Sequence, residues 1–209
     1  MNKKQLAYLP FKRTIDIVGS IVGLIFLSWL FLMLFLIQKI TDPKAPVFYS
    51  HVRVGKNNKH FKMYKFRSMR IDSDTYFDIH PEEYKKFVEN DFKFPAGNDP
   101  RVTKWGRILR RTSLDELPQL LNVLKGDMSI VGPRPITNPE LENYKNNVDK
   151  LLSVRPGMLG LWQASGRSDI VYPERAELDL EYVDKIGFFY DWIIVFKSIA
   201  AVFERKGAF

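Results

Sequence analysis

Residues 112–119, TSLDELPQ, and residues 131–135, VGPRP, form the most informative part of this chain. Two adjacent carboxylates, Asp115 and Glu116, lie there among the arginines Arg107, Arg110, Arg111 and Arg134. Arginine binds phosphate through paired hydrogen bonds, and a carboxylate held among arginines, together with a divalent metal, attacks phosphorus or organises such an attack. The stretch therefore predicts phosphoryl-group chemistry.

A longer segment around these residues resembles a known family. Residues 99–135, DPRVTKWGRILRRTSLDELPQLLNVLKGDMSIVGPRP, are similar to the core signature of the bacterial sugar transferases, the monotopic phosphoglycosyl transferases that begin the assembly of membrane-linked glycans. Further pieces occur in the family's order on both sides, namely PVFY at 46–49, RVG at 53–55, KFRSM at 65–69, RPG at 155–157, QASGR at 163–167 and ELDLEY at 177–182. Several motifs in one order are more specific than any single motif, so the resemblance extends over nearly the whole chain.

The resemblance implies a two-step reaction. Asp115 attacks the β-phosphorus of a UDP-sugar, UMP leaves, and a phosphosugar remains on the aspartate until polyprenol (undecaprenyl) phosphate takes it up. The expected cofactor is Mg²⁺, with Asp115 and Glu116 as its ligands. Glu116 either supports the metal or positions the nucleophile, and these two roles stay open.

Other residues are expected to bind the substrate and its phosphates. The candidates are Lys65, Arg67, Arg110, Arg134, Gln163, Arg167 and Asp179. Arg134 lies between two prolines, in a stiff loop that presents its guanidinium to a phosphate. The resemblance places Lys65, Arg110 and Arg134 near the active site and Asp179 near the substrate. For Asp179 the alternative is an ordinary acid on a helix surface.

The acidic pair also has a purely structural interpretation. Ser113 and Glu116 match a capping box, in which the acids merely begin a helix. Pro118 argues against this, because it would fall inside that helix, whereas proline suits the first helical position. A helix that begins at Pro118 leaves Asp115 and Glu116 just outside its positive end, where a phosphate and its metal are favoured.

Composition limits the possible partners. The chain has 209 residues, enough for one domain plus an anchor, and a formal net charge of +8, which indicates either an anionic partner or a solvated basic surface. It contains no cysteine, which excludes disulfides and thiolate metal sites. His51, His60 and His80 show no metal-ligand spacing and are expected to be ordinary surface or packing residues. Nucleic acid is not an expected partner, because zinc-finger, RNP-like and Walker motifs are absent from the sequence.

An apolar segment near the N-terminus predicts membrane attachment. The sequence carries no charge between Asp16 and Lys39, a length sufficient for one helix across about 30 Å of hydrocarbon. Basic residues flank both ends, so both ends are expected on the cytoplasmic side, and a re-entrant helix satisfies this. We therefore expect a membrane-anchoring helix at 1–40 and a catalytic domain at 41–209, on the cytoplasmic face of the bacterial inner (plasma) membrane.

Two details of this segment affect its geometry. The family's re-entrant helix usually breaks at Ser-Pro, but Ser28 and Trp29 stand at the matching place. Without proline, a hydrogen bond from Ser28 to a carbonyl one turn back is the expected cause of a bend. Gly19 and Gly23 form a GxxxG pair that packs helices together, and they are a weak indication of a homodimer.

The remaining periodicity predicts a fold that is mostly α with a small β element. The membrane-embedded helix is followed by a compact cytoplasmic α/β catalytic domain with interfacial amphipathic helices. We expect strands at 47–54 and 60–69 and helices at 81–92, 103–111, 117–124, 139–152, 176–185 and 190–205. The basic helix at 103–111 suits an anionic membrane surface or ordinary packing with one solvated side.

Two questions stay open at this point. A non-catalytic, membrane-anchored scaffold or lipid-binding protein is the alternative function, although the intact Asp115–Glu116 pair argues against it. Residues 165–169 and 206–209 resemble the branch that handles glucose or galactose rather than acetamido sugars. The release of UMP from a UDP-sugar distinguishes this reaction from binding alone and from ordinary glycosyl transfer, which releases UDP.

Overall fold

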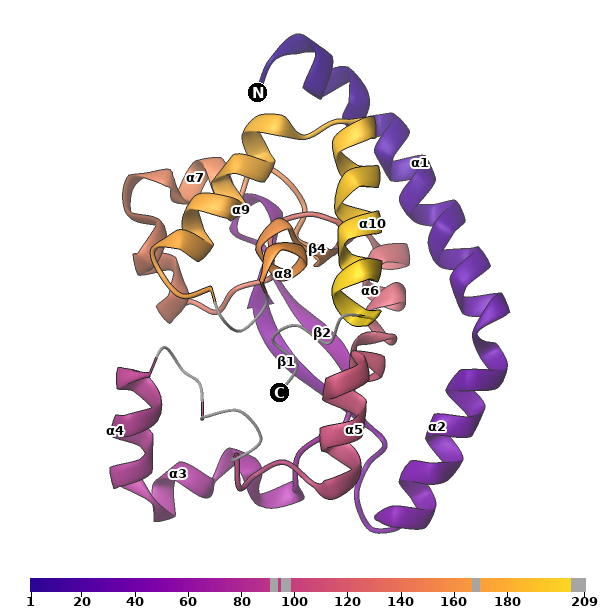
Figure 1. The fold of residues 1–209 in the computed structure, drawn as a ribbon, viewed down its shortest axis with the longest axis vertical. Helices are drawn as coiled ribbons and strands as arrows, with labels where there is room; N and C mark the ends of the chain where they lie inside the picture. Colours follow the sequence, from indigo (N-terminus) through magenta and orange to yellow (C-terminus); the bar gives the residue numbers. More distant parts are fainter. Residues whose placement is uncertain (91–93, 95–98, 167–169, 204–209) are drawn as a thin grey trace.

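The computed structural model of the chain describes residues 1–90, 94, 99–166 and 170–203 (Figure 1). The prediction of a mostly helical fold with a small β element is confirmed. The α-helices are α1 Lys3–Phe26, α2 Ser28–Thr41, α3 Tyr76–Ile79, α4 Pro81–Glu89, α5 Lys104–Thr112, α6 Gln119–Lys125, α7 Val148–Leu151, α8 Leu161–Ser165, α9 Glu174–Lys185 and α10 Phe188–Phe203. The strands are β1 Phe48–Val54, β2 His60–Phe66, β3 Ser129–Val131 and β4 Gly157–Leu159, and 3₁₀ turns occur at Lys56–Asn58, Ile71–Asp74, Leu114–Glu116 and Pro139–Asn147.

Strands β1 and β2 form an antiparallel hairpin that supplies one wall of the domain. Tyr49 pairs with Lys65 and His51 pairs with Met63. Paired residues and alternate residues along a strand share one face, so Tyr49, His51, Arg53 and Lys65 lie on the same side of the hairpin. Helix α6 joins the edge of β2 through Asn122, whose Oδ1 accepts a hydrogen bond from the Tyr64 backbone N–H at 2.9 Å.

A second, parallel pair, β3 with β4, lies at the centre of the domain. Its strands approach so closely that a Cβ on Gly157 would stand 2.0 Å from the backbone nitrogen of Gly132. The main hydrophobic core surrounds this pair and contains Val131, Val154, Leu161, Tyr182, Val183, Ile186 and Ile194. The sequence did not predict these three-residue strands, and β3 leads directly into the loop that contains Arg134.

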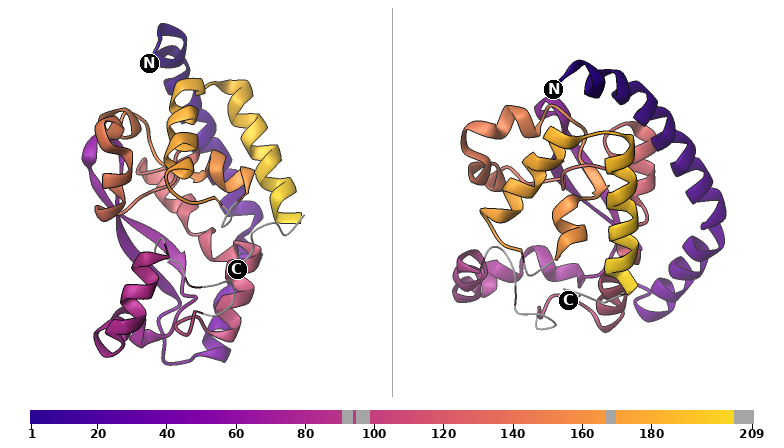
Figure 2. Two further views of the ribbon diagram at one scale, coloured as in Figure 1. Left: turned by 60° about the vertical axis from the view of Figure 1, so that its left-hand side comes forward. Right: turned by 45° about the horizontal axis from the view of Figure 1, so that its top comes forward.

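The N-terminal helices form a bent pair that curves along one side of the domain (Figures 1 and 2). They meet at Leu27 with a bend of 59°, next to the predicted break at Ser28. No single helix in the described residues is long and apolar enough to cross a membrane, whereas the pair together has the length and composition of a broken span or a re-entrant loop. Within the same residues no hydrogen bond involves the Ser28 hydroxyl, so the expected back-bond does not cause the bend.

Helix α1 is joined to the catalytic domain by polar contacts. Asp16 is buried, and its Oδ1 accepts hydrogen bonds from the Ser129 hydroxyl at 3.0 Å and the Ile130 backbone N–H at 2.9 Å. Arg13 donates to backbone carbonyls at the end of α6, including that of Leu124 at 2.8 Å. Asp16, the last charged residue before the apolar segment, therefore holds the start of β3.

The GxxxG pair also packs within the chain. A Cβ on Gly19 would stand 2.8 Å from Ile130 Cδ1, and one on Gly23 would stand 3.3 Å from Leu120 Cδ1. These small residues let α1 approach α6 and β3, so they do not provide a free surface for a second copy. The homodimer stays a prediction without this support.

Several predicted boundaries are wrong. The single helix expected at 139–152 is a 3₁₀ segment, Pro139–Asn147, followed by the short α7. The cause is local, because Lys145 adopts a left-handed φ of 48°, which interrupts any regular helix. Strand β2 ends at Phe66 rather than at residue 69, and α4 ends at Glu89 rather than at residue 92.

Gly106 lies where α5 packs tightly against the segment after β2. A Cβ at this position would stand 1.8 Å from the Ser68 carbonyl oxygen, so we expect Gly106→Ala to cost about 3 kcal/mol of stability. Gly187→Ala is the matched control, because its nearest atom would be 3.7 Å away. Thermal unfolding in detergent measures both variants, and equal melting temperatures would contradict the tight contact.

Candidate active site

The two acids lie in a 3₁₀ turn, Leu114–Glu116, between α5 and α6. Ser113 ends α5 with a left-handed φ of 57°, and Pro118 occupies the position before α6. The prediction that the helix begins at Pro118 is thus correct to within one residue. Ser113 makes no side-chain capping bond, so the capping-box interpretation is wrong. This turn leaves the carboxylates free to contact residues outside their own helix.

Lys65 from β2 holds both acids. Its Nζ lies 2.8 Å from Glu116 Oε1 and 3.8 Å from Asp115 Oδ2, and all three side chains are at most 22% exposed. Burial raises the pKa of Asp115, and Lys65 opposes that rise. For Glu116, Lys65 and Arg134 outweigh the effect of burial and lower its pKa. Glu116 therefore stays charged, and Asp115 is the weakly solvated carboxylate of the pair.

Arg110 from α5 approaches the same centre. Its Nε donates to the Ser68 hydroxyl at 3.0 Å, and its Nη1 lies 4.0 Å from Asp99 Oδ2. Burial lowers the pKa of Arg110, and the charges of Asp115 and Asp99 oppose this. Arg110 is thus within electrostatic reach of Asp115. Asp99 is the first residue of the family signature, but no sequence pattern around it predicts this contact.

The loop that contains Arg134 is held at its start by a buried acid. Asp179 is completely buried, accepts a hydrogen bond from the Arg134 backbone N–H at 3.2 Å and accepts a second from the Tyr144 hydroxyl at 2.8 Å. Burial raises its pKa to about 7, although both hydrogen bonds oppose the rise. Asp179 is therefore not a helix-surface acid; it supports the loop, and its place near the substrate stays a prediction.

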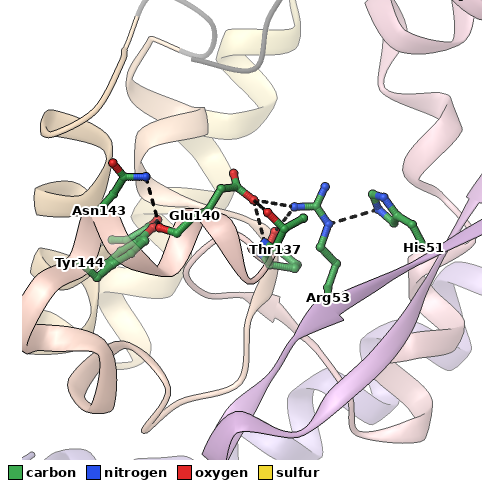
Figure 3. Close-up of polar contacts among 8 residues, drawn as sticks. His51, Arg53, Thr137, Glu140, Asn143 and Tyr144 are labelled. Atoms are coloured by element: carbon green, nitrogen blue, oxygen red, sulfur yellow. Dashed lines mark hydrogen bonds and ion pairs between the residues drawn. The ribbon is translucent and has the colours of Figure 1, made fainter. Parts of the chain in front are cut away.

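The end of the same loop is held by a second network (Figure 3). Arg53 donates from Nη1 to the Pro135 carbonyl at 3.2 Å and to Glu140 Oε2 at 3.0 Å. The backbone N–H and the hydroxyl of Thr137 each donate to the same Glu140 oxygen at 2.7 Å. Arg53 is part of the RVG motif, but the sequence assigned it no role and did not single out Glu140. The two residues are far apart in the chain, so no local pattern indicates their contact.

For three further candidate residues, the described part of the chain shows no contact with Asp115 or Glu116. Arg67 donates to the Pro46 carbonyl at 3.1 Å and lies over the ring of Tyr49. Gln163 is in α8, and its Oε1 is buried without a hydrogen-bond partner in the described part of the chain. Arg167 lies outside the described residues.

The oxygen atoms available for a metal are those of Asp115 and Glu116. The described residues contain no group of three or more His, Cys, Asp or Glu side chains that would form a complete metal site. Mg²⁺ is commonly held by one or two carboxylates with water and substrate phosphates, so this pair fits it. Lys65 contacts Glu116 Oε1 at 2.8 Å but lies 3.8 Å from Asp115, so the Asp115 oxygens are less engaged by the lysine.

The buried Asp115 and the partly buried Glu116 thus lie in a positively charged environment supplied by Lys65, Arg110 and Arg134. The chain belongs to the bacterial sugar transferase family, whose model matches residues 7–205.

Several known proteins are similar to this chain in sequence. The undecaprenyl-phosphate galactose phosphotransferase of Salmonella typhimurium is 48% identical over 95% of this chain and 41% of its own length. The exopolysaccharide production protein ExoY of Rhizobium meliloti is 43% identical over 95% of this chain and 88% of its own length. The UDP-glucose:undecaprenyl-phosphate glucose-1-phosphate transferase of Escherichia coli is 37% identical, again over 41% of its own length. The chain thus spans about two-fifths of the longer relatives.

Removal of Lys65 takes away the cation that contacts both the buried Asp115 and the partly buried Glu116. We expect Lys65→Met to lower the free energy of unfolding by about 3 kcal/mol, and the double variant with Glu116→Gln to recover part of it. The matched control is Lys185→Met, because Lys185 and its partner Glu181 are 58% and 40% exposed. Thermal unfolding in detergent compares them, and equal effects at Lys65 and Lys185 would contradict the proposed charge compensation.

The raised pKa of Asp179 predicts that the stability difference between the wild type and an Asp179 variant depends on pH. Its folded-state pKa of about 7 lies above the ordinary value of about 4, so between these pH values the folded state keeps a proton that the unfolded state releases. Its contribution to stability therefore falls as the pH rises through this window. We expect Asp179→Asn to cost more stability at pH 5 than at pH 8, as measured by thermal unfolding. A difference independent of pH would show that Asp179 does not titrate in this range.

Proposed function

We propose that this protein transfers a sugar-1-phosphate from a UDP-sugar to undecaprenyl phosphate, releases UMP, and so begins the assembly of an exopolysaccharide, a capsule or an O-antigen. The observation that carries this proposal is the buried Asp115, which lies beside Lys65 and within reach of Arg110. The Salmonella and Escherichia coli relatives, which are named as undecaprenyl-phosphate sugar phosphotransferases, support it.

In the first step, an Asp115 carboxylate oxygen attacks the β-phosphorus of the UDP-sugar. The bond between this phosphorus and the oxygen that bridges to the α-phosphorus breaks, and UMP leaves with the bonding electrons. A phosphosugar then remains on Asp115 as a mixed anhydride. Burial of Asp115 favours this attack because a weakly solvated carboxylate is more reactive, and Lys65 limits the accompanying rise in its pKa.

In the second step, an oxygen of undecaprenyl phosphate attacks the same phosphorus. The Asp115 carboxylate is the leaving group, so the enzyme returns to its starting state and the lipid carries a diphosphate-linked sugar. Arg134 is presented by a loop held at both ends, which favours a fixed position against the charged phosphates. Lys65 and Glu116 keep Asp115 oriented through both steps.

Mg²⁺ is the proposed cofactor, with Asp115 and Glu116 as its protein ligands. When bound, it neutralises negative charge on the phosphates and the carboxylates. Lys65 and Arg110 supply the remaining positive charge from the chain itself. We expect removal of divalent cations with EDTA to abolish UMP release and added Mg²⁺ to restore it, and full activity in EDTA would contradict this cofactor.

The proposed location is the cytoplasmic face of the bacterial inner membrane. Large apolar side chains on α1 and α2 are exposed, among them Ile25 at 70%, Phe26 at 76% and Trp29 at 63%. Both ends of the bent pair contact the rest of the domain, which favours re-entry over a straight span (Figure 2). An enzyme at this surface meets a water-soluble nucleotide sugar and a lipid phosphate together, and its basic residues favour anionic headgroups.

The proposed sugar is glucose or galactose. The relatives named for galactose and for glucose support a hexose, whereas much of the sequence that resembles the hexose branch, residues 167–169 and 206–209, lies outside the described part of the chain. A panel of UDP-sugars that includes an acetamido sugar decides this point.

Substitution of Asp115 tests the enzyme against a non-catalytic scaffold. With detergent-solubilised protein, undecaprenyl phosphate and Mg²⁺, we expect UMP release from a UDP-hexose, and we expect Asp115→Asn to reduce it at least 1,000-fold, which corresponds to about 4 kcal/mol of lost transition-state stabilisation. Asp72→Asn is the matched control, because the Asp72 carboxylate is exposed and, among the residues that the structure describes, pairs only with Arg70. Absence of UMP with every donor would favour the scaffold.

A further inference from the structure

His51 lies on the hairpin face that forms a wall of the active site. Its strand neighbours on this face are Tyr49 and Arg53, and the opposite strand contributes Lys65. Lys65 contacts the acidic pair, whereas Arg53 contacts the Pro135 carbonyl at the end of the Arg134 loop. His51 is therefore placed between the nucleophile and the phosphate-binding loop. The sequence predicted an ordinary surface or packing residue here.

The contact with Arg53 determines which nitrogen of His51 carries the proton (Figure 3). Arg53 Nε lies 3.3 Å from His51 Nε2. A guanidinium only donates hydrogen bonds, so Nε2 must be the acceptor and the ring proton must be on Nδ1. Burial and the positive charges of Arg53, Lys65 and Arg134 lower the pKa of His51 to about 3, so the ring is neutral at physiological pH.

The Nδ1–H group is then a free hydrogen-bond donor in the site. Within the part of the chain that the structure describes, the hydrogen bonds of His51 include only the one from Arg53. A neutral donor among several cations adds no charge for a phosphate, which Lys65 and Arg134 already provide. It suits an uncharged hydroxyl group, and a site built around such a hydrogen bond rejects analogues that lack the hydroxyl.

We propose that His51 is a specificity-determining residue whose Nδ1–H binds a hydroxyl group of the donor's sugar. This inference rests on the proposed function. It deepens that function by assigning the recognition of the sugar to β1, whereas the phosphates are bound by the surrounding cations. The alternative role for His51 is to position Arg53, and through it the Arg134 loop, without contact with the substrate.

Two amide substitutions separate these roles, because asparagine places its amide near the position of Nδ1 and glutamine near that of Nε2. His51→Asn keeps a donor for the sugar and loses the acceptor for Arg53. His51→Gln keeps the acceptor for Arg53 and loses the donor. We expect the kcat/KM of UMP release to fall about 100-fold in His51→Gln, mainly through a higher KM for the UDP-hexose, and His51→Asn to be at least tenfold more active than His51→Gln.

The matched control is His60→Gln, on the other strand of the hairpin. His60 is exposed and pairs with Asn138 at 3.0 Å, outside the site, so its substitution should leave kcat/KM within twofold of the wild type. Donors that lack one sugar hydroxyl at a time complete the experiment. The loss in His51→Gln should disappear for the one donor that lacks the recognised hydroxyl.

The outcomes are distinct. Higher activity in His51→Gln than in His51→Asn, or equal activity in the two, would overturn the proposal and leave His51 as a positioning residue at most. A loss of the same size with every deoxy donor would also overturn it, because it would indicate contact with the diphosphate. Absence of UMP release by the wild type would instead overturn the proposed function, and this inference with it.

Discussion

Charge compensation of the buried Asp115 and the partly buried Glu116 by one lysine is the constraint on which this structure depends. Asp115 and Glu116 repel each other, and burial disfavours both charges. Lys65 opposes these effects at 2.8 Å from Glu116 and 3.8 Å from Asp115. The lysine comes from the hairpin and the acids from the turn between α5 and α6, so the hairpin and these helices must dock correctly before the site exists. The asymmetry of the pair, with Glu116 charged and Asp115 weakly solvated, follows from Lys65 being closer to Glu116.

The rest of the fold holds this centre from several sides. The Arg134 loop is fixed at its start by Asp179 and at its end by the network of Arg53 and Glu140. On the opposite side, Asp16 of α1 holds the start of β3, the strand that leads into this loop. The bent N-terminal pair is therefore part of the support for the site as well as its proposed membrane anchor. This connection explains why a polar residue is buried at the edge of an otherwise apolar segment.

The sequence predicted features that depend on local signals or on the family motif. Proline chemistry located the start of α6, and the apolar segment located the bent helix pair. The motif named Lys65, which lies 3.8 Å from Asp115, and its assignment of site residues stays a prediction. Features that depend on contacts between distant residues were missed. Asp179 has the same sequence pattern whether it faces solvent or the interior, and Arg53 and Glu140 are 87 positions apart in the chain. The segment Pro139–Asn147 begins like a helix, with proline at its first position and two glutamates in its first turn, and nothing in the sequence marks the positive φ of Lys145.

In the proposed reaction, Asp115 carries the phosphosugar between the two steps. The most direct measurement incubates the protein with a UDP-hexose labelled in the sugar, without undecaprenyl phosphate, and then separates the protein from free nucleotide. We expect protein-bound label in the same amount as the UMP released, its discharge when undecaprenyl phosphate is added, and its location on a peptide that contains Asp115. Release of UMP only when undecaprenyl phosphate is present, with no label on the protein, would instead show direct transfer between the two substrates.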